Sequence, residues 1–383
     1  MTASATRLTE LLGLALCHRP CASADPLRQG EGEALFALAK RHDLAHALAY
    51  AVEKAELAVS PELLAKLERE RMAAWLRYER SAYELTALTQ TLSQAGIPHV
   101  PLKGAVIRDL YPEAYLRTGC DLDVLVHEEE LERAAEALVT RLGYRRGERG
   151  PHDLSLHTPA GVHIELHFAL MEAVKAGRME APLLSVWEHT REGEGQTLRL
   201  TDGMLYYYHL AHMAKHFASG GCGIRPFLDL WMLRHGGVNV AEAAPLLAEG
   251  GLETFAREAE ALSEAWFGQG EATPVSSRMA EFVLAGGVYG TSATLVTFDK
   301  QGGKGRVGYA LSRIFAPWDT MRDTYPVLRK HPYLLPFCYI KRMAKLLQKD
   351  TRRRARAQME ANATADTAAR AEAEEMLRDL GLR

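Results

Sequence analysis

Two aspartates, Asp121 and Asp123, stand on either side of one leucine and lead into the apolar residues 124–126. Because side chains alternate along a strand, both acids point from one face, while Leu122 and its apolar successors point from the other. Two carboxylates side by side repel each other unless a cation lies between them. Mg²⁺ takes carboxylate oxygens and usually keeps substrate phosphates as further ligands, so the pair predicts a magnesium site.

A third acid, Glu165, lies in a second alternating segment, where Ile164 and Leu166 form the apolar face. If this strand lies beside the first, Glu165 completes a cluster of three carboxylates that can hold two metal ions about 3.5–4 Å apart. Asp121, Asp123 and Glu165 are therefore the predicted catalytic and metal-binding residues. The expected cofactor is a pair of Mg²⁺ ions, with Mn²⁺ as the alternative.

Upstream of the acids, residues 97–102 form a short predicted strand that ends at Gly104, where a helix is expected over residues 105–110. A glycine lets backbone N–H groups approach a phosphate at a helix N-terminus, and Lys103 adds a positive charge. We expect Lys103 and Gly104 to hold the β- and γ-phosphates of an NTP. Arg117 could neutralise the charge that develops during transfer.

These segments belong to a longer series of short motifs: Leu102-Lys103-Gly104, Tyr111-Pro112, Arg117, Asp121-Leu122-Asp123, Gly143-Tyr144 and Glu165-Leu166-His167. In this order they resemble the nucleotidyltransferase superfamily that includes DNA polymerase beta, and more narrowly its large bacterial branch. The resemblance covers roughly residues 35–345 in outline, and its specific motifs occupy residues 97–170. One departure is that the usual Gly-Gly or Gly-Ser turn of the superfamily is Lys-Gly in this chain.

The resemblance implies a metal-dependent enzyme that transfers a nucleoside monophosphate from an NTP to a hydroxyl of an acceptor and releases pyrophosphate. A small molecule, a protein or peptide side chain, and an RNA end all fit as the acceptor. The family pattern also places a helical wall opposite the sheet, at residues 212–216 and 225–229. We expect His212, Lys215 and Arg225 to bind nucleotide or acceptor there, with Asp229 fixing Arg225; a polar interdomain seam is the alternative.

Two other functions stay open. A non-catalytic or antitoxin-like nucleotide-binding module would keep the same fold without turnover. A zinc-dependent phosphohydrolase is conceivable because His163, Glu165 and His167 share one face of a strand, although the paired aspartates suit magnesium better. Residues 303–308 match the spacing G-x-G-x-x-G, but they stand among helical segments and are interpreted as a loop.

The composition is that of a soluble globular protein, with 47% hydrophobic residues and a net charge of −3 over 383 residues. This charge gives no general attraction to nucleic acid or anionic membranes. The five cysteines are scattered, which suits a reducing compartment. No signal peptide and no apolar run of membrane-spanning length is visible, so a cytoplasmic protein without a membrane partner is predicted. The oligomeric state stays open.

The surrounding pattern predicts an α+β fold in which a small mixed-sheet core is embedded between N-terminal and C-terminal helical regions. Four regions are expected: N-terminal helices over 1–96, the catalytic core over 97–172, C-terminal helices over 173–347 and a charged helical tail over 348–383. Ser60 and Pro61 mark the start of a long helix. Residues 325–347 are expected to dock on the rest of the chain, and the tail to form an exposed helix.

Overall fold

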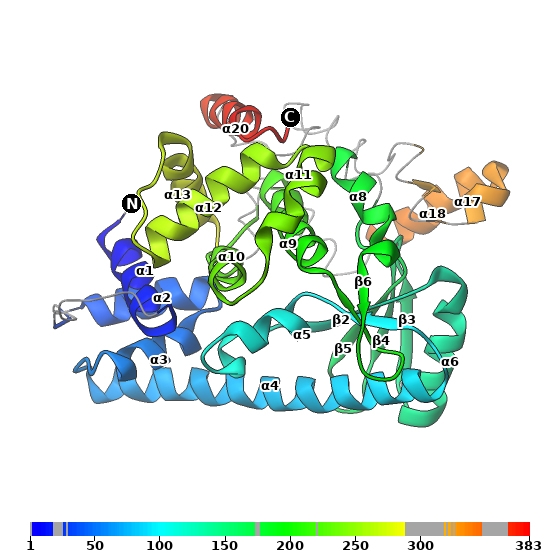
Figure 1. The fold of residues 1–383 in the computed structure, drawn as a ribbon, viewed down its shortest axis with the longest axis horizontal. Coiled ribbons are helices and arrows are strands. Elements are labelled where there is room, and N and C mark those ends of the chain that lie inside the picture. Colours follow the sequence, from blue (N-terminus) through cyan, green and yellow to red (C-terminus); the bar gives the residue numbers. More distant parts are fainter. Residues whose placement is uncertain are drawn as a thin grey trace.

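A small mixed β-sheet lies among helices at the centre of the chain (Figure 1). The computed structural model describes residues 2–17, 26–27, 30–172, 177–219, 221–287, 318, 321–322, 325, 327–346 and 367–383. The predicted α+β class is confirmed, because helices precede and follow the five strands of this sheet. Within these residues, no helix combines the length and the apolar character that a membrane crossing requires.

The sheet has the strand order β1-β2-β5-β4-β3, with β2 and β5 parallel and the other neighbouring pairs antiparallel. The strands are β1 (His99–Pro101), β2 (Asp121–Val126), β3 (Arg145–Arg149), β4 (Asp153–His157) and β5 (His163–His167). Strands were predicted at β1, β2 and β5, and β1 is shorter at both ends than the predicted 97–102. No strand was predicted at β3. The residues of β3 are exposed throughout, so this strand carries no alternation of apolar and polar residues that could predict it.

The long helix α4 (Pro61–Gln94) begins where Ser60 and Pro61 predict, because the Ser60 hydroxyl accepts a hydrogen bond from the Leu63 backbone N–H at 3.2 Å. It runs along one edge of the whole molecule (Figure 1). Its first half packs on the N-terminal helices α2 (Glu31–Arg41) and α3 (Ala45–Lys54), which pack in turn on α1 (Ala3–Leu16). Its second half and α6 (Leu131–Leu142) cover the sheet through Leu88 and Leu92. One helix therefore supports both hydrophobic cores.

The C-terminal helices lie across the sheet from α4 (Figure 1). They include α8 (Ala181–Leu184), α9 (Asp202–Ala218), α10 (Arg225–His235), α11 (Ala244–Gly250), α12 (Glu253–Phe267) and α13 (Pro274–Gly286). A two-stranded hairpin of β6 (Thr190–Glu192) and β7 (Leu198–Leu200) precedes α9. Buried residues of α9, α10 and α12 share one core with those of α1 and α3. The N-terminal and C-terminal helices therefore pack against each other, although the strands of the sheet separate them in the sequence.

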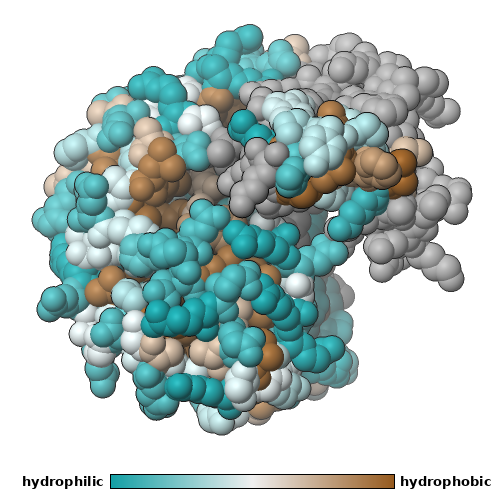
Figure 2. All heavy atoms as spheres, turned by 90° about the vertical axis from the view of Figure 1, so that its right-hand side faces the viewer, coloured by the Kyte–Doolittle hydropathy of each residue, from teal (hydrophilic) through white to brown (hydrophobic). Residues whose placement is uncertain are grey.

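The docked segment predicted over residues 325–347 is confirmed only in part. Helices α17 (Val327–Lys330) and α18 (Leu335–Leu346) form there, and Leu328 and Cys338 are buried in a small cluster of their own. Tyr333, Phe337 and Ile340, however, are 72%, 67% and 63% exposed. The space-filling view of this side shows hydrophobic side chains on a projecting part of the surface (Figure 2). These apolar side chains therefore meet no core surface among the described residues.

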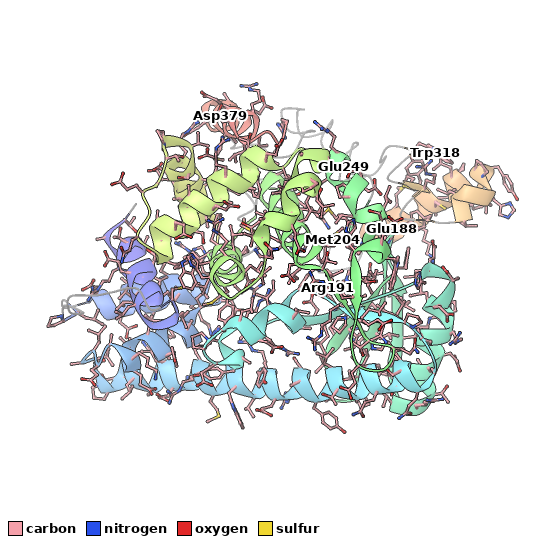
Figure 3. All side chains as sticks on the ribbon, in the orientation of Figure 1. Glu188, Arg191, Met204, Glu249, Trp318 and Asp379 are labelled. Atoms are coloured by element: carbon pink, nitrogen blue, oxygen red, sulfur yellow. The ribbon has the colours of Figure 1, made fainter. Side chains whose placement is uncertain are left out.

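The end of the chain corrects another expectation, that of an exposed tail helix. Helix α20 (Thr367–Asp379) has a buried face, on which Met376 and Leu377 join the core of the central helices. Asp379, labelled in Figure 3, pairs with Arg278 of α13. The charged residues around the apolar positions concealed this docking face in the sequence. The basic residues 352–356 lie outside the described residues.

Candidate active site

A cleft of about 330 Å³ opens at the end of β2, between the sheet and the helices α9 and α10. All nine residues that the sequence nominates as site residues line it: Lys103, Gly104, Arg117, Asp121, Asp123, Glu165, His212, Lys215 and Arg225. The first six belong to the sheet and its loops, and the last three belong to the facing helices. Their place in one cleft is observed, whereas their chemical roles stay predictions.

The register of two parallel strands brings the acids together. Asp123 of β2 lies opposite Glu165 of β5, and Asp121 lies opposite His163. Leu122 and Ile164, on the alternate positions, point into the core that α4 and α6 cover. Apolar alternation therefore directs the polar side chains of both strands to the side of the cleft.

Asp123 is the most completely paired of the three acids. Its Oδ1 atom accepts hydrogen bonds from Lys103 Nζ at 3.0 Å and from His167 Nε2 at 2.8 Å. Burial alone would raise the pKa of Asp123, but the charge of Lys103 and the contact with His167 hold it well below its usual range. Asp123 is therefore a carboxylate with two donors on one oxygen.

Asp121 is in the opposite situation, although it is only two residues away. Burial raises the pKa of Asp121, and the neighbouring carboxylates of Asp123 and Glu165 raise it further. The pKa of Glu165 is lowered, chiefly because His167 Nε2 lies 3.3 Å from its Oε2 atom. The unrelieved repulsion in this cluster therefore falls on Asp121.

The donors around Asp121 fit a hard divalent cation. Among the described residues, two groups of three side chains each have potential ligand atoms within 4.8 Å of one another. One group is Asp121, His163 and Glu165, and the other is Asp123, Glu165 and His167. A cation in the first group would offset the repulsion that raises the pKa of Asp121. The two histidines of the zinc alternative are divided between the groups, which weakens that alternative.

The Lys103–Gly104 turn has a different construction from the one expected. Lys103 has φ 45° and ψ −116°, a left-handed conformation that is strained for a residue with a side chain. At Gly104, an added Cβ would lie 2.5 Å from Arg117 Nη1. A side chain here would displace the guanidinium of Arg117, which hydrogen bonds to Asp229 and to the Thr118 carbonyl hold in place. Helix α5 (Gly104–Ile107), which follows, is only four residues long, so phosphate binding at its N-terminus stays a prediction.

The partner predicted for Asp229 is wrong. Asp229 does not fix Arg225 but pairs with Arg117, through Nη2 at 2.8 Å and Nε at 3.1 Å, and it accepts a third hydrogen bond from the Tyr111 hydroxyl at 2.7 Å. The planar guanidinium of Arg117 matches the carboxylate as a fork. Burial alone would raise the pKa of Asp229, but Arg117 lowers it. This buried pair ties α10 to the loop before β2.

Arg225 instead holds the backbone of that loop. Its Nη1 donates to the Thr118 carbonyl at 3.1 Å, and Arg117 Nη1 donates to the same oxygen at 3.0 Å. The Thr118 hydroxyl in turn donates to Asp43 at 3.1 Å, and Asp43 lies 3.6 Å from Arg225. Two arginines therefore fix the turn that leads into Asp121.

The helix α9 presents His212 and Lys215 to the cleft, together with Tyr208. Burial lowers the pKa of His212 well below its ordinary value, and the charge of Lys103 lowers it further, so the imidazole is neutral. Lys103 Nζ lies 5.9 Å from the ring centre of Tyr208. Tyr208 was not among the predicted site residues, although its position four residues before His212 puts both on one helical face.

A comparison with protein families finds one match. Residues 29–268 match the family model described as "Uncharacterised nucleotidyltransferase". This range covers more than half of the 383 residues and contains the sheet, the cleft and the helices α9 and α10. No curated protein and no solved structure matches the chain.

Proposed function

The chain belongs to the uncharacterised nucleotidyltransferase family, and from this premise we propose that it transfers a nucleoside monophosphate from an NTP to an acceptor hydroxyl and releases pyrophosphate. The observation that carries the proposal is the parallel register of β2 and β5. It gathers three carboxylates on the floor of a cleft whose opposite wall carries His212, Lys215 and Arg225. Acids on the floor, with the ammonium of Lys215 and the guanidinium of Arg225 across the cleft, suit a metal-bound triphosphate between them.

Asp121 and Glu165 would hold a divalent cation, with Mg²⁺ as the first choice and Mn²⁺ as the second. The bound ion would supply charge neutralisation at the transferring phosphate and Lewis acidity toward the acceptor hydroxyl. Glu165 has a lowered pKa and is a carboxylate at neutral pH, so it can accept the proton of the attacking hydroxyl. Asp123 would keep Lys103 and His167 in place beside the ion.

The phosphates would meet positively charged side chains on both walls of the cleft. Lys103 and Arg117 flank the strained turn next to the acids, where charge develops on the oxygen that leaves with pyrophosphate. His212, Lys215 and Arg225 on the facing helices would bind the rest of the nucleotide or the acceptor. The acceptors to test are a small molecule, a protein or peptide side chain, and an RNA end. We place the activity in the cytoplasm, because the five cysteines are scattered along the chain.

The experiment is to incubate the protein with each α-labelled NTP, Mg²⁺ and the three acceptor classes, and to locate the label by mass. A labelled acceptor together with pyrophosphate would support the proposal. Release of inorganic phosphate would point instead to a phosphohydrolase, and nucleotide binding without turnover would point to a non-catalytic module. Asp121→Asn serves as the control, since it removes one carboxylate without changing the size of the side chain.

A further inference from the structure

The cleft contains two cation positions of very different character. The group of Asp121, His163 and Glu165 is partly exposed, whereas the Asp123 side chain in the second group is only 6% exposed. The Lys103 ammonium lies 3.0 Å from Asp123 Oδ1, at the distance of a charged hydrogen bond. The second group therefore already has a cation, and it comes from the protein.

His167 closes the second group further. Its Nε2 atom lies 2.8 Å from Asp123 Oδ1 and 3.3 Å from Glu165 Oε2. Ionised carboxylates only accept hydrogen bonds, so this nitrogen carries a proton and has no lone pair for a metal. Asp123 and His167, two of the three potential ligands in this group, are therefore already paired with each other.

The backbone holds the lysine where it is. The Lys103 carbonyl accepts hydrogen bonds from Val106 and Ile107 at 3.0 and 2.9 Å, which fixes the residue at the start of α5. Its φ of 45° is a conformation that persists only where the surroundings impose it. The side chain is 21% exposed, with its ammonium group over the Tyr208 ring. These contacts hold Lys103 as a fixed member of the acid cluster.

We propose that the site takes a single divalent cation, at Asp121 and Glu165, while the ammonium of Lys103 permanently supplies the second positive charge at Asp123. This inference rests on the nucleotidyltransferase function proposed above, and it replaces the two metal ions that the sequence predicts. It also gives the Lys-Gly turn a function, because the superfamily's usual Gly-Gly or Gly-Ser turn has no charge to offer at this position.

Native mass spectrometry of the full chain tests the inference by counting ions. The probes are Mn²⁺ and the four α,β-methylene NTP analogues. In these analogues a methylene group replaces the oxygen between the α- and β-phosphates, so the bond that nucleotidyl transfer breaks stays intact. We expect one Mn²⁺ per chain with the bound analogue in the parent protein and two in Lys103→Met, where Asp123 loses its cation. Lys103→Arg keeps a positive charge and should keep the count at one. Lys66→Met is the matched control: it removes a surface lysine of α4 that pairs with Glu33 at 2.9 Å and does not line the cleft, so it should also bind one ion.

Two Mn²⁺ ions in the parent would overturn the single-ion inference. A count of one in folded Lys103→Met would overturn the role given to the Lys103 ammonium. Both outcomes would leave the transferase proposal standing. If Lys103→Met does not fold, the counts in the parent and in Lys103→Arg still decide between one ion and two. A parent that binds neither Mn²⁺ nor any analogue would overturn the transferase proposal itself.

Discussion

The two walls of the cleft differ in how well their charges are compensated. On the sheet wall, Asp121 lies beside two other carboxylates, and burial together with their repulsion raises its pKa. On the helical wall, Asp229 is 2% exposed and meets Arg117 and Tyr111 with three hydrogen bonds. A bound cation would stabilise a cluster of like charges, whereas completed pairs already support the fold. The difference supports the proposal that the sheet wall carries the chemistry and that much of the helical wall positions it.

The largest expected effect is on the sheet wall, in Glu165→Gln. Loss of its carboxylate removes a metal ligand and the proposed proton acceptor, so the transfer rate should fall by about 10⁴-fold, or roughly 5.5 kcal/mol. NTP affinity should fall far less than the rate, because Asp121 still contributes to the cation site and the other groups of the cleft still meet the phosphates. Single-turnover kinetics and a separate binding titration measure the two quantities. An equal loss in both would mean that Glu165 binds the nucleotide directly.

The next largest effect is on the helical wall, in Asp229→Ala. This change leaves the guanidinium of Arg117, which is 11% exposed, buried without its carboxylate, and should cost about 3–5 kcal/mol of unfolding free energy. The midpoint of urea unfolding measures it. Arg191, labelled in Figure 3, offers the matched control. It pairs with Glu242 at the surface at 3.2 Å, so Arg191→Ala should cost about 1 kcal/mol or less. Similar losses in both variants would show that the charge of Arg117 has other compensation.

The sheet wall could be predicted from sequence because its rule is local. Alternation within five or six residues sends Asp121, Asp123 and Glu165 to one face, and it holds whatever packs on the other face. The start of α4 followed from Ser60 and Pro61 for the same reason. Only the pairing of β2 with β5 required more than the sequence of a single strand.

The helical wall could be predicted only as a set of residue types. That His212, Lys215 and Arg225 line the cleft follows the family pattern, but the partner of Asp229 is Arg117, which is 112 residues away. Which of two arginines meets a buried carboxylate depends on the tertiary approach of α10 to the loop before β2. The strain at Lys103 and its contact with Asp123, 20 residues away, depend on another tertiary contact, the pairing of β1 with β2.

A pair of substitutions on the helical wall divides binding from support. Lys215→Ala should weaken nucleotide or acceptor binding by about 1.5–3 kcal/mol without changing metal affinity, since the ligands of the metal lie on the opposite wall. Arg225→Ala should lower unfolding free energy as well, because Arg225 also holds the Thr118 carbonyl. Calorimetric titration and thermal melts separate the two effects. If Lys215→Ala destabilises the fold as much as Arg225→Ala does, the wall is an interdomain seam and not a binding surface.

The smallest expected effect compares the two aspartates of β2 without metal. The folded-state pKa of Asp121 is raised, so its ionised form costs stability at neutral pH, and that cost disappears as the pH falls through the folded pKa. Asp121→Asn should therefore have a higher free energy of unfolding than the parent at neutral pH and an equal one at low pH. The difference should be about 0.5 kcal/mol, because the residue as a whole is exposed and solvent screens its carboxylate although that group lies in the cleft. Asp123→Asn should shift the other way, since its carboxylate pairs with Lys103 and His167. Thermal melts between pH 4 and 8 check both signs.

Added Mg²⁺ should stabilise the parent and leave Asp121→Asn unchanged, which reverses the order of their stabilities. Two variants shifting in the same direction would contradict the assignment of one acid to a fixed lysine and the other to a metal ion.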